Sequence, residues 1–192
     1  MTISKIGNFF FKVRSYTPIP IILIIFYFAH PTWYSNYIGS VFIVLGECIR
    51  MWAVGYAGGT TRATTLGAAK DLVTTGPYSY VRNPLYLGNF ILSLGVCFIA
   101  NVLWVIPILV IGYFIQYLPI ISVEETYLLA SCGSVYKFYY DHVPRLFPRL
   151  HPYPTRSSHD FSWIRALDSE KRTLTAIFSV IVLLYIRQYI PL

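Results

Sequence analysis

The chain has 192 residues, of which 56% are hydrophobic and only 12% are charged. An ordinary soluble domain carries roughly 25% charged residues, so this composition argues against a water-soluble fold and predicts a membrane protein. The net charge of +7 is explained by loops that face anionic lipid headgroups. It does not form the basic stripe on a soluble face that a nucleic-acid partner would require.

Five apolar runs approach or reach the length needed to cross roughly 30 Å of hydrocarbon. In chain order they are residues 18–29, 37–57, 85–100, 102–123 and 174–190. The first is short for a span unless it begins near Phe9. The first run could belong to a signal peptide, but no small-residue cleavage site follows it. The sequence therefore predicts an all-α, polytopic membrane protein with about five transmembrane helices.

The positions of the basic residues test this topology independently, because cytoplasmic loops collect Lys and Arg. All but two of the 15 lie before the first span, between the second and third, or between the fourth and fifth. The exceptions are Arg50, inside the second span, and Arg187, near the outer end of the fifth. This pattern predicts a cytoplasmic N-terminus and a cytoplasmic cap over 124–172, which begins with an amphipathic helix that prolongs the fourth span.

The cysteines and histidines do not predict a metal site. Cys48, Cys97 and Cys132 are widely spaced and form no C-x-x-C pair, and the four histidines lack metal-ligand spacing. We expect neither a zinc site nor a disulfide framework.

The stretch TTGPYSYVRNPLYLGNF, residues 74–90, gathers turn and polar residues where the third span begins. Its Gly-Pro dipeptide favours a turn, and Pro84 suits the first turn of a helix. Because the residue before a proline is disfavoured in the helical region, Asn83 is expected to cap this helix. The helix N-terminus would then face the cytoplasmic surface, where it could hold a carboxylate or phosphate.

Polar residues near this point have both a structural and a functional interpretation. Tyr78 and Tyr86 could form an interfacial aromatic belt or the walls of a pocket. Glu47 and Arg50, three residues apart in the second span, are expected to pair, either as a structural ion pair or beside a polar cavity. Glu124 ends the fourth span beside a second glutamate, where a nearby cation or solvent must compensate the charge.

A helix N-terminus, aromatic faces and a glutamate together suit a zwitterionic, partly nucleoside ligand. S-adenosylmethionine has these features, and its sulfonium would also favour aromatic rings. A dinucleotide shares several of them, so these residues alone leave both ligands open.

Three motifs resemble those of isoprenylcysteine carboxyl methyltransferases and related membrane phospholipid methyltransferases. LVTTGPYSYVRNPLYLGNF is similar to their L-V-T-x-G-x-Y-x-x-x-R-H-P-x-Y-x-G. EETYLLASCGSVYKFYYDHVPRLFP resembles E-E-x-x-L…F-G-x-x-Y…V-P-R-x-x-P, and GECIR resembles G-E-x-x-R. The likeness covers 46–148 in the same order and spacing, so this range is the expected catalytic core of a single domain, 1–192.

The resemblance implies an integral membrane enzyme with a cytoplasmic active site. It would take S-adenosylmethionine, release S-adenosylhomocysteine, and methylate a lipophilic acceptor such as a prenylcysteine carboxylate or phospholipid amine, with no obligatory protein partner. Arg50 and Arg145 would be the catalytic residues, nearest the reacting end. The cofactor contacts carried over from the motifs would be Lys70, Asp71, Leu72, Val73, Tyr78, Asn83, Pro84, Leu85, Tyr86 and Glu124.

The chain departs from the family pattern at three positions. Asn83 replaces a histidine and so removes a titratable group, and Cys132 replaces a phenylalanine beside a glycine. Ile120 stands where the prenylcysteine enzymes carry an arginine associated with substrate, which argues against prenylcysteine while leaving methyl transfer intact.

Two other functions remain as alternatives. Membrane sterol and steroid reductases share a similar Arg-His-Pro-x-Tyr and Val-Pro-Arg-like tail but use NADPH. A membrane scaffold without enzymatic activity would have no evident need for Glu47, Arg50 and Glu124 at membrane depth.

Overall fold

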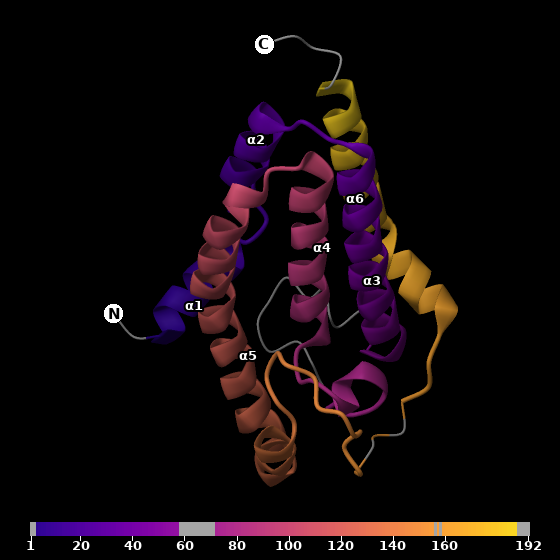
Figure 1. Ribbon diagram of the computed structural model, residues 1–192. Coiled ribbons are helices and arrows are strands. Elements are labelled where there is room, and N and C mark those ends of the chain that lie inside the picture. Colours follow the sequence, from indigo (N-terminus) through magenta and orange to yellow (C-terminus); the bar gives the residue numbers. More distant parts are fainter. Residues whose placement is uncertain (1–2, 58–71, 156, 158, 188–192) are drawn as a thin grey trace.

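The computed structural model describes residues 3–57, 72–155, 157 and 159–187. The regular structure in these ranges is helical and includes no strand, so the all-α prediction is confirmed. Figure 1 labels the six longer helices, and two short 3-10 helices lie before and after α4. Their bounds are α1 Ile3–Val13, α2 Ile19–Phe28, α3 Trp33–Ala57, η2 Gly76–Ser79, α4 Pro84–Ala100, η3 Leu103–Val105, α5 Ile106–His142 and α6 Trp163–Arg187.

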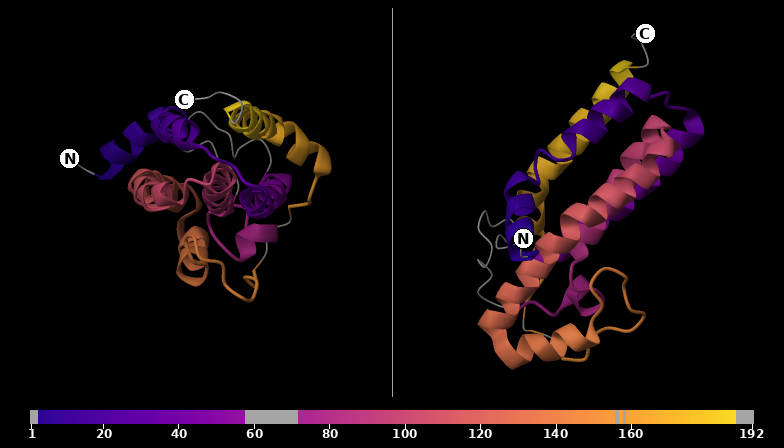
Figure 2. Two further views of the ribbon diagram at one scale, coloured as in Figure 1. Left: turned by 45° about the horizontal axis from the view of Figure 1, so that its top comes forward. Right: turned by 90° about the vertical axis from the view of Figure 1, so that its left-hand side faces the viewer.

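The helices form two layers. In Figure 2, α5, α4 and α3 lie in one row, and α1, α2 and α6 lie behind them. α6 packs on α3, and α1 crosses α5. The α1 crossing is close at Gly7, where an added Cβ would meet the carbonyl oxygen of Pro119 at 2.5 Å. The second layer therefore covers one face of the first.

Facing glycines bring α3 and α4 together as antiparallel neighbours. A Cβ added to Gly39 would meet the carbonyl oxygen of Gly95 at 2.7 Å. Seven residues further along α3, a Cβ added to Gly46 would meet the carbonyl oxygen of Gly88 at 2.9 Å. Small residues at such positions let helix backbones approach closely in a membrane protein, where lipid tails compete with side chains for apolar contact.

The N-terminal region departs from the sequence prediction. The expected first span corresponds to α2, whose 10 residues rise only about 15 Å, roughly half the hydrocarbon thickness. A turn separates α2 from α1, a helix that the prediction did not include. By length and composition, α3 and the stretch Leu103–His142 are the described helical segments able to cross a membrane, whereas α2 and α4 are apolar but shorter. The five-span topology stays a prediction.

The predicted extension of the fourth span is confirmed, because α5 continues to His142. It is bent at Gly133, whose φ of 54° and ψ of −128° are not helical. A positive φ is readily adopted by glycine, which lacks a Cβ. In Figure 2 the helix turns near this point and carries its last part beneath the other helices.

The segment that follows α5 folds back against the chain that leads into α4. Backbone hydrogen bonds of 2.8 to 3.0 Å join the two stretches, and a buried cluster of aromatic side chains anchors the end of α5 to the returning segment. The bonds run from Arg82 N to Pro144 O, from Arg149 N to Tyr80 O, and from Tyr153 N to Ser79 O. The segment before α4 and the segment after α5 are far apart in the sequence, but they pack together below α4.

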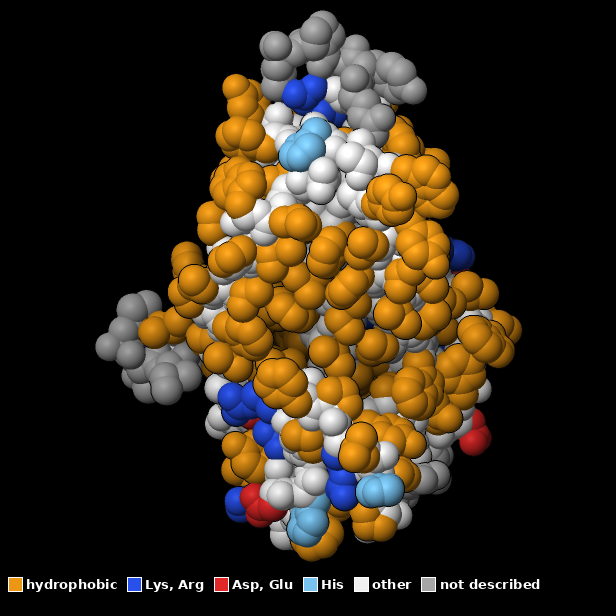
Figure 3. All heavy atoms as spheres, viewed as in Figure 1, with side chains coloured by type: hydrophobic (Ala, Val, Ile, Leu, Met, Phe, Trp, Pro, Cys, Tyr) orange, Lys and Arg blue, Asp and Glu red, His pale blue; other side chains and the backbone are white. Residues whose placement is uncertain are grey.

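The surface has the distribution expected of a protein in a bilayer. Figure 3 shows hydrophobic side chains across the middle of one face, with Lys and Arg gathered mainly toward its lower end. Exposed apolar side chains of the helices include Val44 on α3 and Ile111 and Ile115 on α5. A continuous exposed apolar band of this kind favours contact with lipid.

The glycine contact between α3 and α4 can be tested with a matched pair of substitutions. Gly46→Ala should destabilise the protein by about 1–3 kcal/mol, the usual cost of overpacking, because the new methyl group has no room. Gly112→Ala in α5 should be neutral or stabilising, since a Cβ there meets nothing within 4 Å and alanine favours a helix. Thermal unfolding in detergent, followed by tryptophan fluorescence, measures both. Equal melting temperatures for the two variants would contradict the packing account.

Candidate active site

The predicted start of the third span is confirmed, because α4 begins at Pro84 with Asn83 at the N-cap position. The expected side-chain cap is wrong. The Asn83 side chain makes no capping hydrogen bond; its Nδ2 instead donates to the carbonyl oxygen of Arg145 at 3.1 Å. Asn83 therefore joins the returning segment after α5 to the start of α4.

Three polar side chains follow one another at intervals of three residues, from the N-cap of α4 into its first two turns. Positions three apart are neighbours on a helix surface, so these side chains share one side of α4. Each contacts a different part of the chain: Asn83 the segment after α5, Tyr86 helix α5, and Asn89 helix α3. The start of α4 thus connects the elements that carry the predicted site residues.

Arg50 lies at the last of these connections, the one with Asn89, and is 7% exposed. The predicted pairing with Glu47 is confirmed, with 3.8 Å between Arg50 Nε and Glu47 Oε2. Closer partners come from α6, where Arg50 Nη2 donates to Glu170 Oε2 at 2.6 Å and to Thr173 Oγ1 at 3.1 Å. Nη1 donates to Asn89 Oδ1. Acceptors from α3, α4 and α6 therefore surround the guanidinium.

The position of Arg50 depends on Gly88. A Cβ at residue 88 would lie 2.5 Å from Cγ of Arg50, so any larger residue would displace the arginine stem. The close glycine contact between α3 and α4 and the polar side chains around Arg50 therefore occupy the same region.

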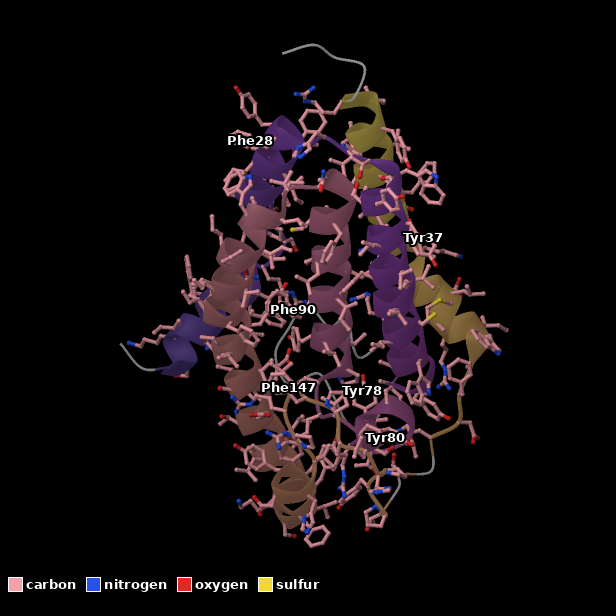
Figure 4. All side chains as sticks on the ribbon, viewed as in Figure 1. Phe28, Tyr37, Tyr78, Tyr80, Phe90 and Phe147 are labelled. Atoms are coloured by element: carbon pink, nitrogen blue, oxygen red, sulfur yellow. The ribbon has the colours of Figure 1, made fainter. Side chains whose placement is uncertain are left out.

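Glu124 of α5 contacts Tyr86, the second of the three polar side chains at the start of α4. The Tyr86 hydroxyl donates to Glu124 Oε1 at 2.8 Å, and the Tyr113 hydroxyl donates to the carbonyl oxygen of Tyr86 at 2.6 Å. The Tyr117 ring lies 5.1 Å from that of Tyr86. Figure 4 shows Phe90 on the same side of α4, between α4 and α5. Aromatic rings therefore line the contact between α4 and α5, beside the Glu124 carboxylate.

The neighbouring glutamate has different partners. Glu125 accepts hydrogen bonds from Arg82 Nε at 3.0 Å and from Arg145 Nε at 3.2 Å. Arg82 also donates to carbonyl oxygens at the end of α5, those of Tyr140 and Val143. The predicted cationic compensation is confirmed here, and Arg145 belongs to a cluster separate from that of Arg50.

Arg145 remains charged in this cluster. Partial burial alone would lower the pKa of Arg145, but the hydrogen bond and negative charge of Glu125 outweigh it, and the pKa is raised above its ordinary value. Its guanidinium therefore offers a permanent positive charge beside the start of α4.

Tyr78 lies below the start of α4, as Figure 4 shows. Burial raises the pKa of the Tyr78 phenol, the charge of Glu124 raises it further, and Arg50 opposes the change. The phenol therefore stays protonated at neutral pH.

The remaining predicted cofactor contacts fall around the same point. Pro84 is buried and Leu85 and Val73 are half-buried, while Leu72 packs against the buried aromatic cluster at the end of α5. Lys70 and Asp71 lie outside the described residues.

The sequence prediction missed the α4 and α6 partners of Arg50. Asn89 carried a usable signal, since it is polar in an apolar run and lies three residues after Tyr86. Glu170 carried none, because its stretch, LDSEKR, has the composition of a solvated cytoplasmic segment.

The chain matches the family model described as phospholipid methyltransferase over residues 34–133, which extend from α3 into α5. It is 33% identical to a protein-S-isoprenylcysteine O-methyltransferase of Schizosaccharomyces pombe, over 75% of this chain and 61% of that protein. A second enzyme of that name, from Dictyostelium discoideum, is 30% identical over 60% of this chain and 50% of its own length.

The chain is also similar to the cobalt-zinc-cadmium resistance protein CzcN of Cupriavidus metallidurans, with 30% identity over 68% of this chain and 60% of that protein. No solved structure is significantly similar to it. The chain thus spans less than two thirds of the length of these curated relatives. Since the family match covers just over half of the 192 residues, the chain belongs to the phospholipid methyltransferase family, and within it resembles the protein-S-isoprenylcysteine O-methyltransferases.

Proposed function

We propose that this protein is an integral membrane methyltransferase that transfers the methyl group of S-adenosylmethionine to a lipophilic acceptor. The observation that carries the proposal is the polar face of α4, where Asn83, Tyr86 and Asn89 each engage a different part of the chain. Family membership supports the same reaction. The proposed single catalytic domain spans 1–192, with its core at 46–148 and its active site on the cytoplasmic side.

The residues at the start of α4 fit the chemical groups of this cofactor. The positive end of the helix dipole at Pro84 favours a carboxylate, and the Glu124 carboxylate favours an ammonium group or a ribose diol. The rings of Tyr78 and Tyr86 offer faces that attract a sulfonium cation. When bound, S-adenosylmethionine would supply an electrophilic methyl group.

The protein's own part in such a transfer is to hold the acceptor and exclude water. An in-line displacement needs the nucleophile about 3–3.5 Å from the methyl carbon, and it needs no catalytic histidine or cysteine. Arg50 and Arg145 are proposed to orient an anionic acceptor, whereas for an amine a nearby glutamate would accept a proton. Ile120, which is fully buried, offers no charge to a prenylcysteine carboxylate, so a phospholipid amine remains an equal candidate.

Ligand titration separates this proposal from a reductase. Purified protein in detergent should bind S-adenosylhomocysteine and should show no saturable binding of NADPH when both are followed by calorimetry. Saturable NADPH binding without binding of S-adenosylhomocysteine would replace the methyltransferase proposal with the reductase alternative.

Glu124→Gln should weaken S-adenosylhomocysteine binding while leaving the fold intact. Losing a hydrogen bond to a charged group costs about 1.5–3 kcal/mol, which corresponds to a roughly 10- to 100-fold rise in Kd. Asp168→Asn is a suitable control, because Asp168 is an exposed carboxylate on α6 paired with Lys171. Unchanged affinity in Glu124→Gln, measured on protein with a wild-type melting temperature, would remove Glu124 from the cofactor site.

A further inference from the structure

We infer that Glu170 and Thr173 of α6 position the guanidinium of Arg50 for the methyl acceptor, so that α6 completes the site built by α3 and α4. The inference rests on the proposed function, since it assigns Arg50 to the acceptor. It extends that function to a helix outside the range that the family model matches, which ends at residue 133.

The burial of Glu170 is the first observation behind this role. Its side chain is 0% exposed, although its neighbours in sequence, Asp168 and Lys171, are exposed. An ionised carboxylate inside a protein is costly unless it is paired and hydrogen-bonded. The 2.6 Å contact with Arg50 Nη2 supplies that pairing across 120 residues of sequence.

The geometry of Arg50 is the second observation. Its guanidinium is a planar group with five N–H donors in a fixed arrangement, so partners on two different nitrogens define its orientation. Asn89 accepts from Nη1, and Glu170 and Thr173 accept from Nη2. Without the α6 acceptors, Nη2 would lose its described partners and the plane could rotate. These bonds use three of the five N–H donors, and Nε lies 3.8 Å from Glu47 Oε2.

The packing of α6 gives the third observation. Ala166 is also fully buried, one helical turn before Glu170, and the backbone N–H of Ser162 donates to the carbonyl oxygen of Gly55 at 3.0 Å. These contacts fix the start of α6 against the end of α3, on which Arg50 lies. Glu170 therefore lies on a helix whose start is fixed against α3.

Glu170→Gln tests the role, because it keeps the size of the side chain and removes its charge. Proteoliposomes would be assayed for transfer of tritiated methyl from S-adenosylmethionine to N-acetyl-S-farnesylcysteine and to dioleoylphosphatidylethanolamine. With whichever probe the wild type methylates, kcat/KM should fall about 10- to 100-fold, as expected for a lost charge-assisted bond. The Kd of S-adenosylhomocysteine should stay within about twofold, since the change would act through Arg50.

A double-mutant cycle distinguishes positioning from a contribution to the fold alone. In an Arg50→Lys background, which keeps the charge but loses the planar group, Glu170→Gln should cost little further activity. A purely structural role would lower the folded fraction and leave the rate per folded molecule unchanged in either background. Asp168→Asn, an exposed change on the same helix, should alter neither quantity.

Thr173→Val provides a second route if Glu170 variants fail to fold. It preserves the shape of the side chain and removes the 3.1 Å bond to Arg50, so kcat/KM per folded molecule should fall while cofactor affinity is kept. Wild-type kcat/KM in every folded variant at these two positions would overturn the inference. A wild-type protein that binds no S-adenosylhomocysteine and methylates neither probe would instead contradict the proposed function.

Discussion

The close approach of α3 and α4 is the constraint on which the rest of the structure depends. Facing glycines allow the two backbones to touch, and the absence of a side chain at Gly88 leaves the space that the Arg50 stem occupies. A charged residue can therefore pass between two apolar helices and reach acceptors on both α4 and α6. With larger residues at Gly46 or Gly88, the helices would separate and Arg50 would lose its fixed surroundings.

The start of α4 organises the polar residues around this contact. Charges are scarce in the chain, and the buried ones occur in groups that satisfy each other: Arg50 with Glu47 and Glu170, and Glu125 with Arg82 and Arg145. Such pairing limits the cost of burial without by itself giving much stability. The position of these costly groups beside the aromatic rings between α4 and α5 supports the proposed ligand site.

Local signals predicted some of this arrangement well. Proline chemistry located the start of α4, helical spacing predicted the Glu47–Arg50 pair, and periodicity predicted that α5 would extend past the apolar run. The incorrect and missed predictions depend on contacts between residues far apart in the sequence. Asn83 Nδ2 donates to the Arg145 carbonyl, and Glu170 is buried where α6 packs on α3. The helix α1 was missed because its charged residues resemble a cytoplasmic leader, while its apolar side packs on α5.

A structure of the protein with S-adenosylhomocysteine bound in a lipid bilayer tests the central claim most directly. The amino-acid end of the ligand should lie at the N-terminal end of α4, within about 10 Å of Asn83 and Tyr86, roughly the diameter of a helix with its side chains. A ligand bound beyond that distance from both residues would contradict the assignment of this helix terminus as the cofactor site.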